Sequence, residues 1–288
     1  MTNMRLQLGD LEIHGITEIE QFDVPLDFMF PEIGALLRDN DALASIDPSV
    51  LSHGQVHLTI RSWLLRKDNR VILIDGCVGN HKTRRHWPSW HQRDDDGWPR
   101  RLASLGVRPE DVDIVMCTHL HADHVGWNTK LEHDIWVPTF PNATYLTGRV
   151  EYDYWLADSV AGDKHGSFAD SVMPVVEAGQ MAFLEDGSDI AHGLSVELAP
   201  GHTPGQLLLN ARGGDRGAVF CGDVIHSPLQ LSFPDISSAI CEDRQQATRT
   251  RRHLLSRLCD NGDFLLPGHF ANPGWCQIRA VSDAFEMR

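Results

Sequence analysis

The feature that most constrains the fold is a short apolar segment, residues 112–117, that leads directly into a cluster of metal-binding side chains. The segment is rich in β-branched residues and is bounded by charged ones, which indicates a buried strand rather than a helix. The next residues include the run His-Leu-His-Ala-Asp-His, residues 119–124. A strand that delivers four such groups within six residues predicts a metal site at its end.

The spacing within this run suggests two metal positions. Side chains two residues apart in an extended chain point the same way, so His119 and His121 reach one ion together. Asp123 and His124 follow the turn and are directed at a second position beside the first. Imidazole nitrogens and carboxylate oxygens are the ligands of borderline cations such as zinc. A single buried histidine is more often a hydrogen-bonded core residue, but four groups this close together favour the metal.

Composition limits the class of protein. A chain of 288 residues forms one large α/β domain or two small ones, and without internal repeats or linkers we expect a single domain over residues 1–288. The formal net charge of −15 argues against nucleic acid or an anionic membrane as a partner. The six scattered cysteines, with no Cys-x-x-Cys pair, favour free thiols in a reducing cytoplasm. We find no signal peptide and no apolar run long enough to span a membrane, and therefore expect a cytoplasmic protein.

The remaining periodicity predicts alternating strands and helices. We expect strands at 5–19, 56–66, 70–75, 181–184, 194–199, 206–211, 217–221 and 264–266, with further strands broken at two prolines within 135–148. We expect helices at 98–105, 149–157, 167–178 and 242–259. The arginines of the last helix form either an anion site or a solvated face, and the solvated face is favoured.

Two segments show neither strand nor helix periodicity. Residues 22–55 are aromatic and proline-rich, so we interpret 1–55 as an N-terminal extension that covers a pocket, with Phe22 and Phe28 as substrate contacts. A dimer contact or plain surface packing explains the same residues equally well, and a homodimer stays open. Residues 79–98 hold three tryptophans and three histidines and are interpreted as a surface excursion with solvated histidines. Trp127, just after the cluster, is a third candidate substrate contact.

Three later motifs each place a metal-binding side chain just after an apolar strand. They are Ala-Pro-Gly-His with His202, Phe-Cys-Gly-Asp with Asp223, and Leu-Pro-Gly-His with His269. The glycine beside each ligand permits backbone conformations and close approaches that a β-carbon would block. Loops at strand ends are where α/β scaffolds place their sites. Each motif alone is weak evidence for a metal site, but the order of the three motifs after the first cluster makes the combination strong evidence.

This order of motifs resembles the metallo-β-lactamase superfamily from about residue 56 to residue 272. The resemblance implies an α/β fold, the αββα four-layer sandwich of two mixed sheets flanked by helices. It implies that one metal is held by His119, His121 and His202 and the other by Asp123, His124 and His269, with Asp223 bridging both. The cofactors would be two divalent ions, with zinc expected and manganese, iron or cobalt as alternatives.

Such a site predicts hydrolysis. Two ions about 3.5–4 Å apart bind a water between them and lower its pKa from 15.7 toward about 7. The resulting bridging hydroxide attacks a carbonyl carbon or a phosphoryl phosphorus. Five histidines and two carboxylates leave the centre net positive, which stabilises the developing oxyanion. Asp123 is a candidate proton shuttle to the leaving group, and Asp223 both binds and spaces the ions.

Neighbouring residues narrow the kind of hydrolase. N-acyl homoserine lactonases resemble this arrangement but carry a tyrosine three residues after the bridging aspartate, where this chain has His226. The same Gly-Asp-x-x-His pattern resembles the group that includes methyl parathion hydrolase. His226 either polarises the substrate or protonates the leaving group, or it is a loop histidine without a role. Cys221 is interpreted as a small core residue rather than a ligand.

We therefore expect a dinuclear hydrolase of a small-molecule lactone or carboxylic ester, with a phosphotriesterase or arylesterase as the alternative. Glyoxalase-type thioesterases carry a basic C-terminal patch that is absent after residue 272, and RNA-processing nucleases need a basic exosite. Flavodiiron proteins replace a metal histidine and add a flavin domain. A metal-binding module without turnover would be expected to lack at least one of the seven ligands, and none is missing.

Overall fold

The computed structural model describes residues 4–33, 46–164, 166–271 and 274–288. Its larger sheet has the strand order β1-β2-β4-β5-β6-β9-β10, with β3 paired to β4, and its smaller sheet has the order β11-β12-β13-β14-β15. The larger sheet comprises β1 (Arg5–Leu8), β2 (Leu11–Pro25), β3 (Leu51–Ser52), β4 (Gln55–Lys67), β5 (Arg70–Ile74), β6 (Ile114–Met116), β9 (Thr144–Gly148) and β10 (Met181–Leu184). The smaller sheet comprises β11 (Asp189–Ala191), β12 (Leu194–Leu198), β13 (Leu207–Gly213), β14 (Arg216–Gly222) and β15 (Phe264–Pro267).

Helices and two short hairpins complete the architecture. The hairpins are β7 (Thr129–Glu132) with β8 (Ile135–Pro138), and β16 (Ile278–Val281) with β17 (Ala284–Met287). The α-helices are α1 (Leu26–Met29), α3 (Gly97–Ser104), α4 (Ala122–Val125), α5 (Arg149–Ala161), α6 (Met173–Glu177), α7 (Leu229–Ser232) and α8 (Arg244–Asn261). Within the described chain none of these helices is long and apolar enough to cross a membrane.

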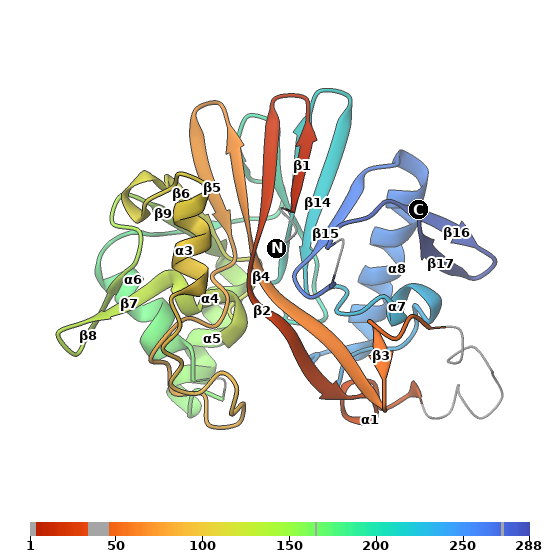
Figure 1. The fold of residues 1–288 in the computed structure, drawn as a ribbon, viewed down its shortest axis with the longest axis horizontal. Helices are drawn as coiled ribbons and strands as arrows, with labels where there is room; N and C mark the ends of the chain where they lie inside the picture. Colours follow the sequence, from red (N-terminus) through yellow and green to blue (C-terminus); the bar gives the residue numbers. More distant parts are fainter. Residues whose placement is uncertain (1–3, 34–45, 165, 272–273) are drawn as a thin grey trace.

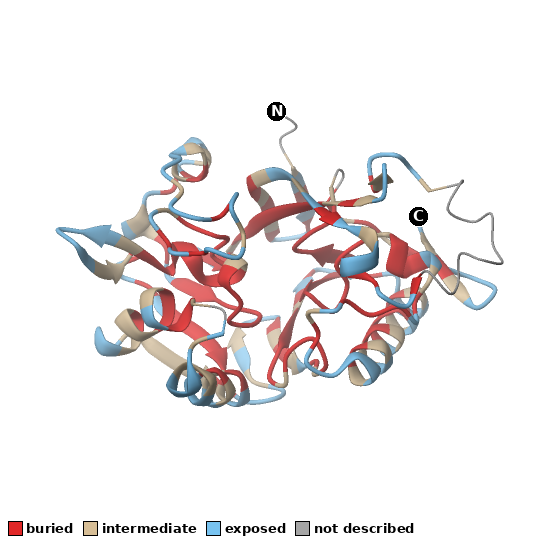
Figure 2. Cartoon of the chain, turned by 90° about the horizontal axis from the view of Figure 1, so that it is seen from below, coloured by how far each residue is buried: buried red, intermediate tan, exposed pale blue. Residues whose placement is uncertain are grey.

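The elements stack in four layers, as Figure 1 shows, with the two sheets facing each other between helices on either side. Apolar residues of both sheets, including Ile72 and Phe220, form the core between them. On the outer face of the larger sheet Trp98 of α3 and Trp155 of α5 pack into a second core, and Leu255 of α8 packs into a third behind the smaller sheet. Figure 2 shows this burial along the sheets and the inner faces of the helices. The expected αββα sandwich is confirmed.

Strand direction explains where a site can form. β5, β6, β9 and β10 run parallel to one another, and β14 runs parallel to β15. The carboxyl ends of parallel strands meet at one edge of a sheet, and the loops leaving that edge carry the functional groups of α/β proteins. Asp75, His119, Asp223 and His269 all follow such carboxyl ends. The topology therefore brings together residues that are up to 194 positions apart.

Most predicted elements are present, with shifted ends. The last helix runs from 244 to 261: the Asp243 side chain accepts a hydrogen bond from the Gln246 backbone at 2.9 Å, and Gly262 ends the helix in the left-handed region. Strand β8 ends at Pro138 and β9 begins at Thr144, after Pro141, so the strands are broken at the two prolines as expected. The sequence interpretation missed β7, β11 and the C-terminal hairpin.

The interpretation of residues 22–55 as irregular was wrong at both ends. Strand β2 continues to Pro25, so Phe22 lies in a strand and pairs with Leu58 of β4. Two irregularities in the β2–β4 register explain the failure, because they interrupt the alternation by which a strand is recognised. Residues 34–45 of this segment lie outside the described residues.

Candidate metal centre

The structure brings all seven predicted ligands together in two groups. The first contains His119, His121, His202 and Asp223, and the second contains Asp123, His124 and His269, with the ligand atoms of each group within 4.8 Å of one another. His119 and His121 lie in the turn after β6, and His124 lies on α4. His202 lies between β12 and β13, whereas Asp223 and His269 follow β14 and β15.

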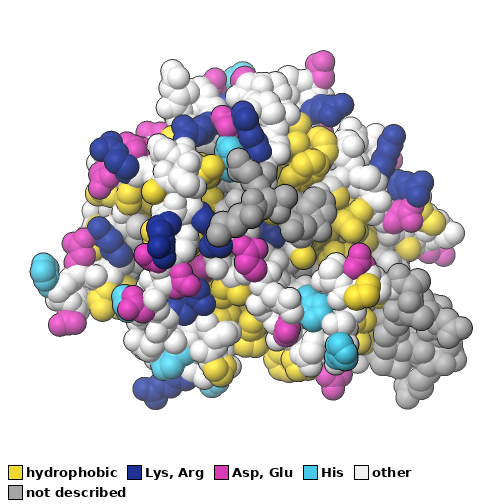
Figure 3. All heavy atoms as spheres, in the orientation of Figure 1, with side chains coloured by type: hydrophobic (Ala, Val, Ile, Leu, Met, Phe, Trp, Pro, Cys, Tyr) yellow, Lys and Arg dark blue, Asp and Glu magenta, His cyan; other side chains and the backbone are white. Residues whose placement is uncertain are grey.

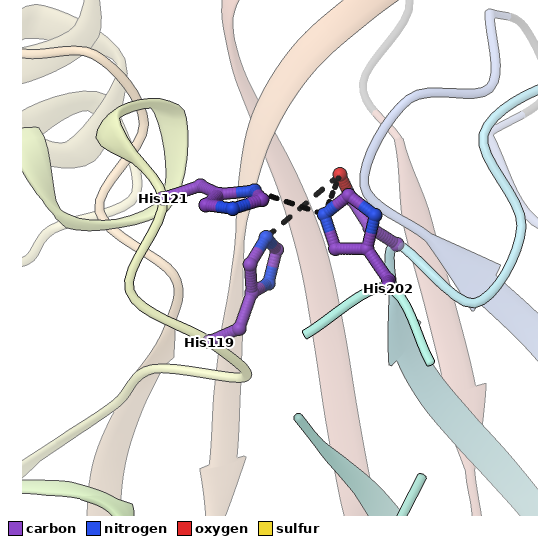
Figure 4. Close-up of side chains that lie close together, drawn as sticks. His119, His121 and His202 are labelled. Atoms are coloured by element: carbon purple, nitrogen blue, oxygen red, sulfur yellow. Dashed lines mark hydrogen bonds and ion pairs between the residues drawn. The ribbon is translucent and has the colours of Figure 1, made fainter. Parts of the chain in front are cut away.

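In the first group three imidazoles point toward one another, as Figure 4 shows. The Nε2 atom of His202 lies 2.9 Å from Nδ1 of His121 and 3.3 Å from Oδ2 of Asp223. Nε2 of His119 lies 3.8 Å from the same carboxylate oxygen. Four donor atoms therefore converge on one position.

The second group faces the other oxygen of Asp223. Oδ1 of Asp223 lies 3.0 Å from Nε2 of His269 and 3.2 Å from Nε2 of His124. The Oδ2 atom of Asp123 lies 3.6 Å from Nε2 of His269. Asp223 thus directs one oxygen at each group, which is the arrangement a carboxylate needs to lie between two cations.

The chemistry of these donors fits divalent cations. Burial lowers the pKa of His119 and of His202 well below the usual value, which favours the neutral imidazoles that bind metals. Burial alone would raise the pKa of Asp223, but the surrounding histidines hold it well below its usual range. Nε2 of His119 is buried without a hydrogen-bond partner among the described residues. A buried cluster of this kind is costly unless a cation satisfies it.

The other ring nitrogen of four ligand histidines has a partner of its own. Such partners fix the ring orientation and the tautomer of a metal-binding histidine. The Nδ1 contacts are His124 with Asp75 Oδ2 at 2.9 Å, His269 with the Thr59 carbonyl at 2.8 Å, His119 with Thr118 Oγ1 at 3.1 Å, and His202 with Cys241 Sγ at 3.5 Å. These contacts leave Nε2 of each ring directed into the centre.

Sequence reasoning missed two carboxylates that support the site. Asp75 accepts hydrogen bonds from the backbone and hydroxyl of Thr118 at 2.7 and 2.9 Å, besides its contact with His124. Its position just after β5, at the carboxyl edge of the sheet, was the signal that could have identified it. Glu151 on α5 is fully buried. No local pattern marks it, because its partners come from distant loops.

Glu151 connects the loops that carry the first group of ligands. It accepts hydrogen bonds from the backbone N–H groups of Leu120 at 3.0 Å and Gly205 at 3.1 Å. The Thr203 hydroxyl and the Trp155 indole donate to it at 2.7 and 2.6 Å. Leu120 lies between His119 and His121, and Thr203 follows His202, so this single carboxylate holds both loops in register.

A cavity of about 360 Å³ opens above the centre. Its floor includes His121, Asp123, Asp223, His226 and His269. Its apolar lining includes Phe22, Val24, Met29, Leu58, Trp87, Trp90 and Ile240. The metal centre is therefore reached through a partly apolar pocket of the size that takes a small molecule.

The three predicted substrate contacts have different positions. Phe22 lines the cavity. Phe28 is 50% exposed, with its ring 6.3 Å from that of Trp87, and it is not among the described lining residues. Trp127 is a core residue instead: it stacks on Trp98 at 5.1 Å and donates its indole N–H to Glu18 at 2.8 Å. The prediction that Trp127 contacts substrate is not supported, because its ring is used in packing.

His226 lies beside the two groups. Its Nε2 atom is 3.2 Å from Asp223 Oδ2, and its ring is parallel to that of His269 with centroids 5.9 Å apart. Apart from this ion-pair contact, neither ring nitrogen has a hydrogen-bond partner among the described residues. The Gln230 side chain holds the His226 backbone N–H at 2.7 Å. The ring therefore faces the cavity floor rather than solvent.

Two other expectations need correction or refinement. Residues 79–98 are more than a surface excursion, since Trp87 and Trp90 form the cavity wall, although His81 and His91 are exposed as expected. In α8 the solvated face is confirmed for Arg244 and Arg249, which are exposed, whereas Arg252 and Arg257 are half-buried. Arg251 is buried and donates to the carbonyls of Pro234 and Ile236. Cys221 is a buried core residue, as expected.

Comparison with known proteins agrees with this geometry. The family model described as the metallo-beta-lactamase superfamily matches residues 58–269. This chain belongs to the metallo-beta-lactamase superfamily. The matched region begins in β4 and ends at His269, so it contains all seven candidate ligands described above.

Curated relatives in this superfamily match parts of the chain. The N-acyl homoserine lactonase AttM of Azorhizobium caulinodans is 38% identical over 69 residues, covering 24% of this chain and 22% of that protein. Metallo-beta-lactamase domain-containing protein 1 of Xenopus laevis is 30% identical over 175 residues, 60% of each chain. The hydroxyacylglutathione hydrolase of Aeromonas salmonicida is 29% identical, and the match covers 57% of this chain and 46% of that protein. The chain thus spans less than two thirds of each of these relatives.

Solved structures of similar fold cover almost the whole chain. AidC, described as a dizinc quorum-quenching lactonase, has a TM-score of 0.78 and 21% identity and covers 99% of this chain and 96% of its own. The hydrolase AbOPH has a TM-score of 0.80, with the same identity and coverage. At this identity the likeness concerns the fold.

Proposed function

We propose that this chain is a hydrolase that uses two divalent cations, with zinc preferred, to cleave a small-molecule lactone or carboxylic ester. The observation that carries the proposal is the position of Asp223, which directs one carboxylate oxygen at each of two converging ligand groups on the floor of a cavity. Lactonases among the relatives add support for the substrate class.

The ligand assignment follows the two groups. His119, His121 and His202 would hold one cation, Asp123, His124 and His269 the other, and Asp223 both. When bound, a pair of divalent cations supplies a Lewis acid for the substrate oxygen and lowers the pKa of a shared water toward about 7. Burial of these side chains excludes bulk solvent from the floor and strengthens electrostatic interactions there.

Two side chains of the floor would move protons. The Asp123 carboxylate is 13% exposed and borders the cavity, so it is placed to accept a proton from the attacking water and to pass it toward the leaving oxygen. The His226 ring also borders the cavity, and its proximity to Asp223 favours a hydrogen bond from this imidazole to the substrate or the leaving group.

A second candidate is an arylesterase or phosphotriesterase. The observation that favours it is the aromatic wall, in which the rings of Phe22 and Trp87 lie 5.3 Å apart and those of Trp87 and Trp90 lie 5.1 Å apart. Such a wall would stack on an aryl leaving group.

The proposal also includes the role of the N-terminal segment, the cellular compartment, the class of partner and the oligomeric state. Phe22, Val24 and Met29 line the cavity, which supports an N-terminal segment that packs against the active site within one domain. Six free cysteines support a reducing cytoplasm. Basic and acidic side chains are interspersed over the face seen in Figure 3, which favours a small-molecule substrate over nucleic acid. A homodimer is left to measurement of the mass in solution.

The test is a substrate panel on the zinc-loaded protein: a lactone, an alkyl ester, an aryl ester and a phosphotriester, each before chelation, after chelation and after zinc is restored. We expect hydrolysis of the lactone or the carboxylic esters that is lost with the metal and regained with it. Preference for the phosphotriester would select the second candidate. Failure to hydrolyse any of the four would contradict the proposed function.

A further inference from the structure

Charged side chains line the cavity above the metal centre. Apart from the metal-ligand groups and His226, the ionisable residues among its described lining are Arg84, Arg85, His86, Asp163 and Lys164. Substrates are held partly by such groups, so the pairing state of each one decides what it can recognise.

Two of these cations are already paired. The Arg84 guanidinium binds both oxygens of Asp170 at 2.8 Å and donates to the Gly166 carbonyl at 2.6 Å. Lys164 forms an ion pair with Glu242. Both are committed to holding protein segments together and have little capacity left for a ligand.

Arg85 differs from its neighbour. Within the described chain it makes no hydrogen bond, ion pair or ring contact, although it borders the cavity. Its backbone is nevertheless firmly placed, because Lys82 and Arg84 on either side of Thr83 both extend to Asp170 and are buried. Arg85 is thus an unpaired guanidinium on an anchored segment.

The aromatic wall continues directly from this arginine. Trp87 is two residues along the chain, and its ring packs against Phe22 at 5.3 Å and Trp90 at 5.1 Å. A ligand that reaches from the metal centre to Arg85 would pass along this apolar surface.

We propose that Arg85 forms an anion subsite, so that the substrate is an ester or lactone whose apolar body carries an anionic group, such as a carboxylate or sulfonate, away from the bond that is cleaved. This inference rests on the proposed function and specifies the substrate class. A guanidinium presents several donors in a fixed plane and binds carboxylates in a bidentate manner. A chain with a net charge of −15 disfavours the approach of anions overall, so their recognition needs a local cation.

Asp163 supplies a negative charge among the lining residues of the same cavity. Its side chain lines the cavity and has no ion-pair or hydrogen-bond partner in the described part of the chain. It disfavours an anion nearby, so its neutralisation should strengthen anion recognition. Asp163 has a φ of 48°, a conformation that asparagine adopts readily, so Asp163→Asn is a mild variant.

The first measurement compares two esters with the same leaving group, mono-p-nitrophenyl adipate, which ends in a carboxylate, and p-nitrophenyl hexanoate, which is neutral. Arg85→Gln should lower the ratio of their kcat/KM values by roughly 10- to 100-fold, the range for hydrogen bonds to a charged group. Asp163→Asn should raise that ratio. Arg100→Gln is the control, since Arg100 is an exposed arginine on α3 that pairs with Asp96 and does not line the cavity.

The second measurement is binding, which does not depend on turnover. Naphthalene-2-sulfonate and its neutral analogue 2-(methylsulfonyl)naphthalene are titrated into the zinc-loaded protein by calorimetry. Wild type should bind the sulfonate more tightly than the sulfone, and Arg85→Gln should remove the difference.

The outcomes separate this inference from the proposed function. Sulfonate binding that depends on Arg85, in a protein that hydrolyses neither ester, would support the subsite and contradict the hydrolase. Hydrolysis of both esters with an unchanged ratio in Arg85→Gln would overturn the subsite and leave the hydrolase standing. An equal change in Arg100→Gln would also overturn it, since the effect would then come from overall charge.

Discussion

Oδ2 of Asp75 lies 2.9 Å from Nδ1 of His124, so a side chain just after β5 orients a proposed metal ligand on α4, 49 residues away. Asp75 also fixes Thr118, whose hydroxyl lies 3.1 Å from Nδ1 of His119. One carboxylate outside the ligand set therefore supports a histidine of each group. Metal affinity should depend on Asp75 although it contacts no metal position.

Replacing Asp75 should weaken metal binding. We expect Asp75→Asn to lower metal affinity by about 10- to 100-fold, the usual effect of removing a carboxylate behind a ligand histidine. Asparagine also tolerates the φ of 61° at this position. Competition with a chromophoric chelator measures the affinity. Asp113→Asn, at the amino end of β6, is the control, and equal affinities in wild type and Asp75→Asn would refute the role.

Replacing His226 should lower the catalytic rate without changing metal binding. His226→Ala should keep its metal content, because His226 belongs to neither ligand group, while kcat falls. Proton transfer by a side chain contributes about 10²–10⁴-fold, so the loss should be large for a lactone or alkyl ester. It should be small for an aryl ester, whose phenolate leaves without a proton. Wild-type rates on the unactivated substrate would remove His226 from the mechanism.

Glu151 should matter for stability. Glutamine supplies only one acceptor oxygen for four donors, so Glu151→Gln leaves buried donors unpaired, each at a cost of about 1–3 kcal/mol. We expect a loss of roughly 2–4 kcal/mol in the free energy of unfolding by urea denaturation. The exposed Glu177→Gln should change it by less than about 0.5 kcal/mol. If the two variants were equally stable, Glu151 would not hold the ligand loops.

Lys82 should make the free energy of unfolding depend on pH. Burial lowers the pKa of Lys82 to about 7, with Arg84 lowering it further and Asp170 opposing. The unfolded value is about 10.4, so between these values the unfolded chain carries a proton that the folded chain lacks. The free energy of unfolding therefore rises with pH over this range, by up to about 1.4 kcal/mol per unit.

Lys82→Met removes this titration. The difference in unfolding free energy between wild type and Lys82→Met should increase in favour of wild type by about 2 kcal/mol from about pH 7.5 to about pH 9.5. Urea denaturation of both proteins at the two pH values measures it. A difference that stays constant would mean that Lys82 remains charged throughout this range in the folded state.

How far the sequence predicted the site depended on the range of the interactions. His119, His121 and Asp223 could be located because each follows an apolar strand and stands beside a glycine or another ligand. Asp75 and Glu151 could not, because their partners are supplied by loops that only the sheet order brings near.

The environments of Trp127 and Phe22 also depend on contacts that the sequence does not show. Trp127 was expected at the substrate because it follows the ligand run, but the packing of Trp98 against it depends on where α3 docks. The irregular β2–β4 register concealed the strand that carries Phe22. Periodicity predicted most of the individual strands and helices, because it does not depend on their partners, whereas the four-layer arrangement was expected only from the resemblance to the superfamily.

We propose that seven side chains hold two cations that together produce hydrolysis. The most direct test is titration of the metal-free protein with zinc, recording bound metal and the rate of ester or lactone hydrolysis in the same samples. We expect the rate to reach its plateau only as about two equivalents per chain become bound. A plateau at one equivalent, or a rate that does not depend on zinc, would contradict it.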